Sequence, residues 1–109
     1  MLPNADRAVI EASKVRDYLL SPVHPVGRFK SVVFTAFGYS QEGWERLRDD
    51  LLVHARDNTA ALVQTSEYGQ KFEVSGMLTG PSGRSGRFVS IWILSAPDQA
   101  PKLVTAYPE

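Results

Sequence analysis

The sequence contains no cysteine, and this absence excludes disulfide bonds and metal sites built on thiolates. It is compatible with a reducing compartment. The N-terminal stretch "MLPNADRAVI" lacks both the basic and the apolar segment of a secretory leader, so we expect a cytoplasmic protein. Long apolar runs are also absent. The longest, "FVSIWIL" at 88–94, is far too short to span a bilayer, and we expect no membrane partner.

The chain has no excess of charge of either sign, because 12 lysines and arginines balance 12 acidic residues. This balance weighs against a general nucleic-acid coat protein, whose affinity depends on neutralising phosphates. The charges are nevertheless unevenly placed. The segment 24–38 carries Arg28 and Lys30 and no acidic residue. A neutral chain of this kind can still present a local basic site.

The first half of the chain has helical periodicity. With 109 residues it is large enough for one hydrophobic core, and we expect a single domain over 1–109. Three segments predict helices, each bounded by a proline, glycine or serine signal. The second of these segments, 27–38, carries an apolar stripe. In the third, 41–57, we expect His54 to face solvent. These segments are "EASKVRDYLLS" (11–21), "GRFKSVVFTAFG" (27–38) with Phe29, Val32, Val33, Ala36 and Phe37, and "QEGWERLRDDLLVHARD" (41–57).

The periodicity changes to alternation after Asn58, which predicts strands. Gly76 within the second strand suggests a bulge. The third strand is apolar on both faces and is therefore predicted to be central. The expected fold is α+β, with N-terminal helices (about 1–57) packed on a four-stranded antiparallel β-meander (about 58–109). The strand segments are "ALVQTSEY" (61–68), "QKFEVSGMLT" (70–79), "RFVSIWILS" (87–95) and "KLVTAYP" (102–108).

His24 is the first candidate for chemistry, because Pro22 and Pro25 restrict the backbone on both sides of it. Imidazole suits proton transfer near neutral pH. The alternative is a loop histidine or a helix-capping group. Lys30 follows closely and is able to stabilise a developing oxyanion. Its alternative is a solvated lysine.

Two further regions carry polar groups that suit phosphate or its chemistry. The loop "GPSGRSGR" (80–87) offers glycine backbone and the guanidinium groups of Arg84 and Arg87, although an ordinary hairpin is an equal alternative. Thr105 and Tyr107 alternate along the last strand, so their hydroxyls share a face; such pairs are also commonly structural. No His, Asp or Glu grouping has the spacing of metal ligands, and we expect no metal or other cofactor.

Several segments together resemble a small bacterial domain family of unknown function. That family has a helix ending in YLL, an HPxG corner followed by lysine, a YGxK strand start and a terminal TAYP. It is in turn similar to the barnase–EndoU–colicin–RelE nuclease class, which are metal-independent RNases, often toxins, with helices packed on a four-stranded antiparallel sheet. The segments are "LPNADRAVI", "KVRDYLLSPVHPVGRFKSVVFTAFGY", "EYGQKFEV", "LTGPSGR" and "LVTAYP".

The resemblance implies an RNase-like toxin domain that cleaves RNA by attack of a ribose 2′-OH and is neutralised by a cognate antitoxin protein. The implied catalytic set is His24, Lys30, Lys71, Thr105 and Tyr107, with Arg28, Tyr68, Arg84 and Arg87 as substrate-binding residues. Two alternatives stay open. One is a protein-interaction module whose partner surface is Trp92, Tyr107 and Phe88. The other is a nucleic-acid-binding domain without catalysis.

A catalytic site of this kind makes a spatial demand. His24 or Lys30 must lie across a concave surface from at least one of the sheet residues Lys71, Arg87, Thr105 and Tyr107. Proton transfer and charge stabilisation have to act on the same phosphate.

Overall fold

The fold is a helical layer followed by an antiparallel sheet, as the alternation pattern predicts. The computed structural model describes residues 1–109. After a 3-10 turn at Ala5–Arg7 come α1 (Ala12–Lys14), which continues as a π-helical turn at Val15–Leu19, then α2 (Gly27–Ala36) and α3 (Trp44–Asp57). The strands are β1 (Ala60–Ser66), β2 (Gly69–Thr79), β3 (Ser85–Leu94) and β4 (Lys102–Pro108), in the order β1-β2-β3-β4, every pair antiparallel. The predicted α+β meander is confirmed.

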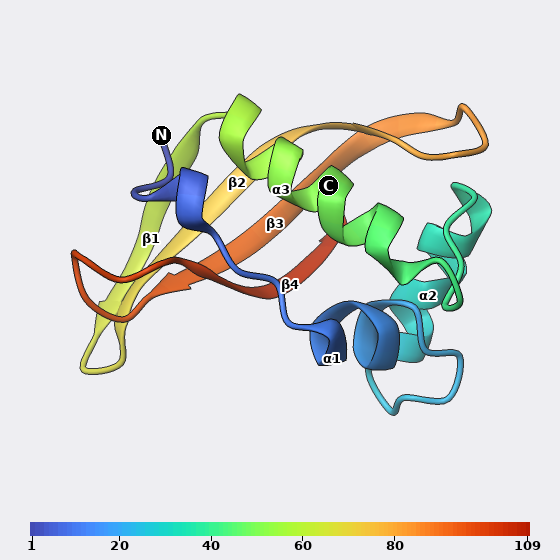
Figure 1. Cartoon of the computed structure of the whole chain (residues 1–109), viewed down its shortest axis with the longest axis horizontal. Helices are drawn as coiled ribbons and strands as arrows, with labels where there is room; N and C mark the ends of the chain where they lie inside the picture. Colours follow the sequence, from blue (N-terminus) through green and yellow to red (C-terminus); the bar gives the residue numbers. More distant parts are fainter.

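The two faces of the sheet differ, because α3 covers only one of them. Figure 1 shows α3 lying across one face, with α1 and α2 grouped beyond one end of the sheet. We call the face under α3 the core face; it carries the buried Val74, Trp92 and Ala106. Side chains alternate along a strand, so their neighbours point to the opposite side. We call this side, which carries Lys71 and Thr105, the outer face.

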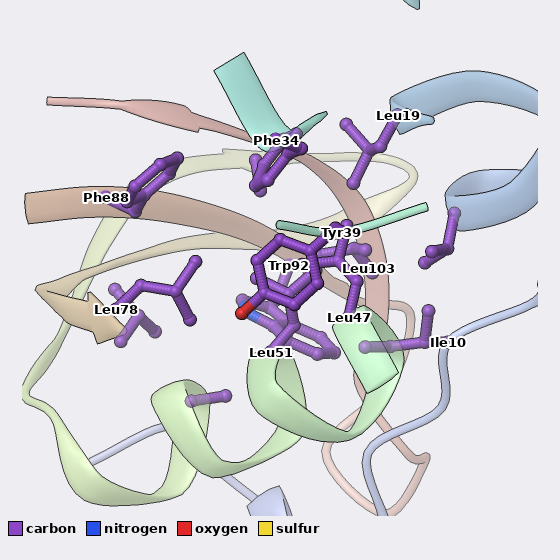
Figure 2. Close-up of a cluster of buried hydrophobic side chains, with 14 of the residues drawn as sticks. Ile10, Leu19, Phe34, Tyr39, Leu47, Leu51, Leu78, Phe88, Trp92 and Leu103 are labelled. Atoms are coloured by element: carbon purple, nitrogen blue, oxygen red, sulfur yellow. The ribbon is translucent and has the colours of Figure 1, made fainter. Parts of the chain in front are cut away.

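The core is built from aromatic and leucine side chains of α2, α3 and the core face. Leu47 and Leu51 of α3 pack beside Trp92, as Figure 2 shows, and all three side chains are fully buried. Phe34 of α2 stacks on Phe88 of β3 with ring centroids 5.3 Å apart. Trp92 and Phe88 therefore form no partner surface, contrary to the interaction-module alternative, because the central strand directs both into the core.

The apolar stripe of α2 divides between core and solvent. Phe37 is buried and Val33 is half-buried, whereas Phe29 and Val32 are 67% and 70% exposed. The side chain that anchors the helix is Phe34, which is fully buried. Because α2 lies beyond the end of the sheet, only one narrow side of it meets the core.

His54 is buried, and the expectation that it faces solvent is wrong. It follows Leu47 and Leu51 by seven and three residues, so it falls on the same helical face as these core leucines. Its Nδ1 accepts a hydrogen bond from the Ser90 hydroxyl at 3.2 Å, and its Nε2 donates to the carbonyls of Gly76 and Phe88 at 3.2 Å each. Every polar atom of the ring is thereby satisfied.

Bulges occur in both edge strands rather than at Gly76. The pairing of β2 with β3 runs unbroken past Gly76, whose missing Cβ leaves room for the Asn58 side chain. In β1, Leu62 and Gln64 pair with two consecutive residues of β2. In β4, Leu103 and Thr105 likewise pair with two consecutive residues of β3. Val63 and Val104 are therefore the extra residues. None of the helices is long and apolar enough to cross a membrane.

Candidate functional site

The HPxG corner is held by two side chains that accept backbone hydrogen bonds. The buried Ser21 accepts at Oγ from the N–H groups of Val23 and His24, at 3.3 and 3.1 Å. His24 accepts at Nδ1 from the N–H groups of Val26 and Gly27, both at 3.0 Å. His24 thus caps the start of α2. This is the helix-capping role given above as an alternative to proton transfer. Nδ1 carries no proton in this geometry, so the neutral ring bears its hydrogen on Nε2.

Gly27 lets α2 pack directly on the backbone of Tyr18. A Cβ at Gly27 would lie 1.9 Å from the Tyr18 carbonyl oxygen, so no other residue fits without a shift of the helix. Tyr18 itself belongs to the π-helical turn at Val15–Leu19. Such turns are frequent at functional sites. The glycine of the HPxG corner therefore fixes the position of this tyrosine.

The Tyr18 side chain is the centre of a cluster of polar and cationic groups. Its hydroxyl oxygen lies 3.1 Å from Thr105 Oγ1 on the outer face. The His24 ring meets the tyrosine ring edge-on, with centroids 5.0 Å apart. The ammonium nitrogens of Lys30 and Lys14 lie 5.6 and 5.9 Å from the centre of the same ring.

This environment lowers the pKa of the Tyr18 phenol below its ordinary value. Burial is the largest influence and acts to raise the pKa. It is outweighed by the hydrogen bonds with Thr105 and Lys30 and by the positive charges of Lys30 and Lys14, all of which favour the phenolate. A tyrosine that ionises more readily than usual is suited to proton transfer.

An open pocket of about 620 Å³ exposes this cluster to solvent. Its one acidic side chain, Asp17, is paired with Arg16 at 2.9 Å and so leaves the cluster's positive charge uncompensated. His24 and Thr105, which the sequence places in one site, line the same pocket. The lining includes Lys14, Asp17, Tyr18, His24, Val104 and Thr105.

Lys71 and Tyr68 line a second pocket, of about 360 Å³. It shares Val104 with the first pocket, so the two lie on either side of the β4 bulge. Lys71 is half-buried, and Tyr68 is 76% exposed at the β1–β2 turn. Lys71 forms none of the protein's ion pairs.

The remaining predicted residues line neither pocket, and this includes Lys30, which contacts the Tyr18 ring from outside the lining. Arg87 is paired with Glu109 at 2.9 Å, and Arg84 lies over the Phe37 ring at 5.1 Å. Arg28 lies over the ring of its exposed neighbour Phe29, 4.7 Å from its centre. Tyr107 points to the outer face, two residues beyond Thr105 and opposite Val89.

Tyr18, at the centre of the cluster, is not among the site residues that the sequence predicts. Its spacing from Lys14 is one helical turn, and it opens the YLL motif. That spacing was the available signal. No group of three or more His, Cys, Asp or Glu side chains is placed to hold a metal ion.

Comparison with known proteins gives a family and a fold. A family model described as "Domain of unknown function (DUF6883)" matches residues 1–109. A chain from a solved contact-dependent growth inhibition toxin–immunity protein complex of Klebsiella pneumoniae 342 has a similar fold, with a TM-score of 0.76 and 22% identity. The similarity covers 94% of this chain and 100% of that chain. No curated protein matches the sequence.

Proposed function

The chain belongs to the DUF6883 family, and we propose that it is a metal-independent ribonuclease of toxin type in which Tyr18 is the general base. The observation that carries this proposal is the Tyr18 phenol with its lowered pKa, held against Thr105 in an open pocket that Lys14 also lines, with Lys30 over the same ring. The fold shared with a chain of a toxin–immunity complex supports the toxin part of the proposal. RNA in the cytoplasm is the proposed substrate.

The proposed reaction transfers one phosphoryl group within the RNA strand. The Tyr18 phenolate takes the proton of a ribose 2′-OH, and the 2′-oxygen forms a bond to the adjacent phosphorus. The bond from phosphorus to the 5′-oxygen breaks, and the Lys30 ammonium gives this oxygen a proton. The products are a 2′,3′-cyclic phosphate and a 5′-hydroxyl end. Return of a proton from Tyr18 to Lys30, through water, restores the site.

The other groups of the cluster stabilise charge and hold the base. Lys14 and Lys30 offset the negative charge that accumulates on the phosphate. The Nε2–H of His24 donates to a non-bridging oxygen, because Nδ1 is engaged by the start of α2. This role differs from the proton carrier expected from the sequence. Thr105 positions the phenol.

The test is cleavage of total RNA by the purified protein in the presence of EDTA. We expect fragments ending in 2′,3′-cyclic phosphate, and no such fragments with Tyr18→Phe. Tyr107→Phe is a matched control, since Tyr107 lies on the same face but outside the pocket. Intact RNA after incubation with folded wild-type protein contradicts the proposal, as does full activity of Tyr18→Phe.

The exposed stripe of α2 favours a second role, binding of a neutralising partner protein. Val26, just before α2, and Phe29 and Val32 within it recur every three residues and are 52%, 67% and 70% exposed. The segment 24–38 has no acidic residue, so the complementary surface is apolar with acidic groups around it. This surface takes the place of the partner surface predicted from the sequence, because Trp92 and Phe88 are buried.

A rescue experiment tests this second role. Cells that express the domain and stop growing are supplied with a library of the source organism's genes, and the rescuing protein is recovered. Phe29→Glu is expected to remain toxic and to escape rescue, whereas Glu67→Gln, at an exposed position on the β1–β2 turn, is rescued as wild type is. Equal rescue of Phe29→Glu contradicts this surface.

A further inference from the structure

We propose that the second pocket binds the base of the nucleotide next to the scissile phosphate, and that Gln64 selects this base. The inference rests on the proposed ribonuclease function. The pocket is built by Gln64, Ser66, Tyr68, Lys71, Ile93 and Val104. It therefore combines hydrogen-bonding groups, an exposed aromatic ring, a lysine and an apolar floor.

The two pockets are spaced for one nucleotide. Lys71 pairs with Ile93 in β3, and Thr105 pairs with Ile91 of the same strand. The two residues are thus separated by two strand spacings and by two residues along the strands. With the usual dimensions of a sheet, their backbones lie roughly 12 Å apart. A phosphate at Tyr18 and Thr105 leaves its neighbouring base within reach of the second pocket, across Val104.

The bulge in β1 is what directs Gln64 into this pocket. Gln64 lies opposite Lys71, and Leu62 lies opposite Phe72, with Val63 as the extra residue. In a regular strand without the bulge, Val63 itself would pair with Lys71, because a shift by one residue moves every side chain to the other face. The bulge thus places an amide where a regular strand would place an apolar side chain. Bulges commonly redirect side chains beside functional sites.

The groups around the pocket match the way proteins bind unstacked RNA bases. Such bases stack on aromatic rings and are read along their hydrogen-bonding edges. Tyr68 supplies an exposed ring. The Ser66 hydroxyl accepts the Tyr68 N–H at 3.2 Å, which leaves its own hydrogen free to donate. Lys71 has no carboxylate partner and is available to an adjoining phosphate.

Gln64 gives the pocket a preference among purines. Its amide offers one donor and one acceptor, which match N7 and the amino group of adenine. Guanine presents two acceptors at the corresponding positions, and these suit arginine or lysine instead. The preferred purine is therefore adenine, and Gln64→Arg is expected to change the preference to guanine.

A binding experiment tests the pocket without requiring cleavage. Labelled protein is titrated with each of the four ribonucleoside 3′-monophosphates and followed by NMR. We expect the signals of the Gln64 side-chain amide and of the Tyr68 and Lys71 backbone to shift, with adenosine 3′-monophosphate binding more tightly than its guanosine counterpart. The same shifts are expected in Tyr18→Phe, which removes catalysis only. Shifts that avoid these residues overturn the inference, whether or not the protein cleaves RNA.

A cleavage experiment then tests base selection. Sequencing of cleavage sites is expected to show adenine preferred over guanine at one position, and guanine preferred for Gln64→Arg. Tyr68→Ala is expected to raise KM by roughly fivefold or more, as loss of base stacking predicts. Glu67→Gln on the same turn is the control. Cleavage with unchanged KM and unchanged base preference in both pocket variants overturns the inference while leaving the ribonuclease proposal intact. Absence of cleavage together with the NMR shifts contradicts the ribonuclease proposal and retains only the base-binding role of the pocket.

Discussion

The hydroxyl oxygens of Tyr18 and Thr105 lie 3.1 Å apart, although 87 positions separate the two residues in the chain. The contact joins the end of the first helical segment to an edge strand of the sheet. His24, Lys14 and Lys30 all lie around the ring of Tyr18. The contact with Thr105 therefore holds the whole cluster against the outer face of the sheet. The chemistry proposed for the protein depends on it.

Removal of the Tyr18 hydroxyl is expected to slow RNA cleavage strongly, with little effect on the fold. A general base contributes about 10²–10⁴-fold to a rate, so Tyr18→Phe should lower kcat/KM by about 100-fold or more. Thr105→Val keeps the phenol and removes its hydrogen-bond partner, so a smaller loss is expected. Initial rates on a defined oligonucleotide measure both variants. A larger loss in Thr105→Val than in Tyr18→Phe would show that the phenol is not the base.

Cleavage is expected to accelerate as pH rises, because the phenolate is the active form of Tyr18. The pKa of the phenol lies below its ordinary value of 10.0, so the midpoint of the rise in kcat/KM should also lie below 10.0. Lys14→Met removes one of the charges that favour the phenolate and should move the midpoint to higher pH. The pH–rate profiles of both proteins provide the measurement. A midpoint that falls in Lys14→Met excludes Tyr18 as the titrating group.

Stability is expected to decrease in acid because of His54. Burial lowers the pKa of His54 from its ordinary value of 6.5, and the hydrogen bonds to the Gly76 and Phe88 carbonyls offset this only in part. Below about pH 6.5 the unfolded chain therefore binds a proton that the folded chain resists. The free energy of unfolding should be level above that pH and fall beneath it. Urea titrations from pH 5 to 8 measure this, and His54→Gln should lose that part of the slope.

Gly27→Ala is expected to destabilise the protein and to displace Tyr18. The added methyl group would lie 1.9 Å from the Tyr18 carbonyl oxygen, which forces α2 away from the π-helical turn. We expect a cost of about 1–3 kcal/mol, as for other overpacked sites. Gly43→Ala is the control, because Gly43 has a negative φ of −100° and its Cβ would meet Ser40 Oγ at 3.2 Å. Equal stability of Gly27→Ala and wild type in urea would refute the close packing at this corner.

Two phenylalanines of α2 are expected to differ strongly in their effect on stability. Phe34→Ala empties a fully buried site against Phe88 and should cost about 3–5 kcal/mol. Phe29→Ala removes a ring that is 67% exposed and should change stability by less than about 1 kcal/mol. Thermal and urea unfolding of the two variants measure the contrast. A similar cost for both would place Phe29 in the core.

The fold was predictable from sequence because its signals are local. The change from helical period to alternation near Asn58 separates the helices from the sheet, and Gly38, at φ 98°, ends the second helix as expected of a glycine there. The alternation of Thr105 and Tyr107 likewise predicts their shared face. Each of these inferences needs only neighbours in the chain.

The rest of the site could not be predicted in this way. Tyr18 finds its hydrogen-bond partner on a strand, 87 positions away, and no local pattern in the sequence predicts that contact. Val63 and Val104 are β-branched residues in ordinary alternating strands, so nothing in the sequence distinguishes them as bulges. His54 was misjudged for another reason. Its spacing from Leu47 and Leu51 marks a core position, but a histidine on the flank of an amphipathic helix is predicted to face solvent.

The bulges of the edge strands also affect how the domain meets other copies of itself. A straight edge strand presents unpaired N–H and C=O groups that promote aggregation through strand pairing. β1 would be vulnerable, since Leu62 and Val63 are each 50% exposed, but the bulge at Val63 interrupts its regular edge. At the other side of the sheet, Val9 covers β4 through backbone bonds of 2.9 Å to the Pro101 carbonyl and 3.1 Å from the Leu103 N–H. The bulge that turns Gln64 toward the second pocket therefore also protects β1 against edge-to-edge association, while Val9 protects β4.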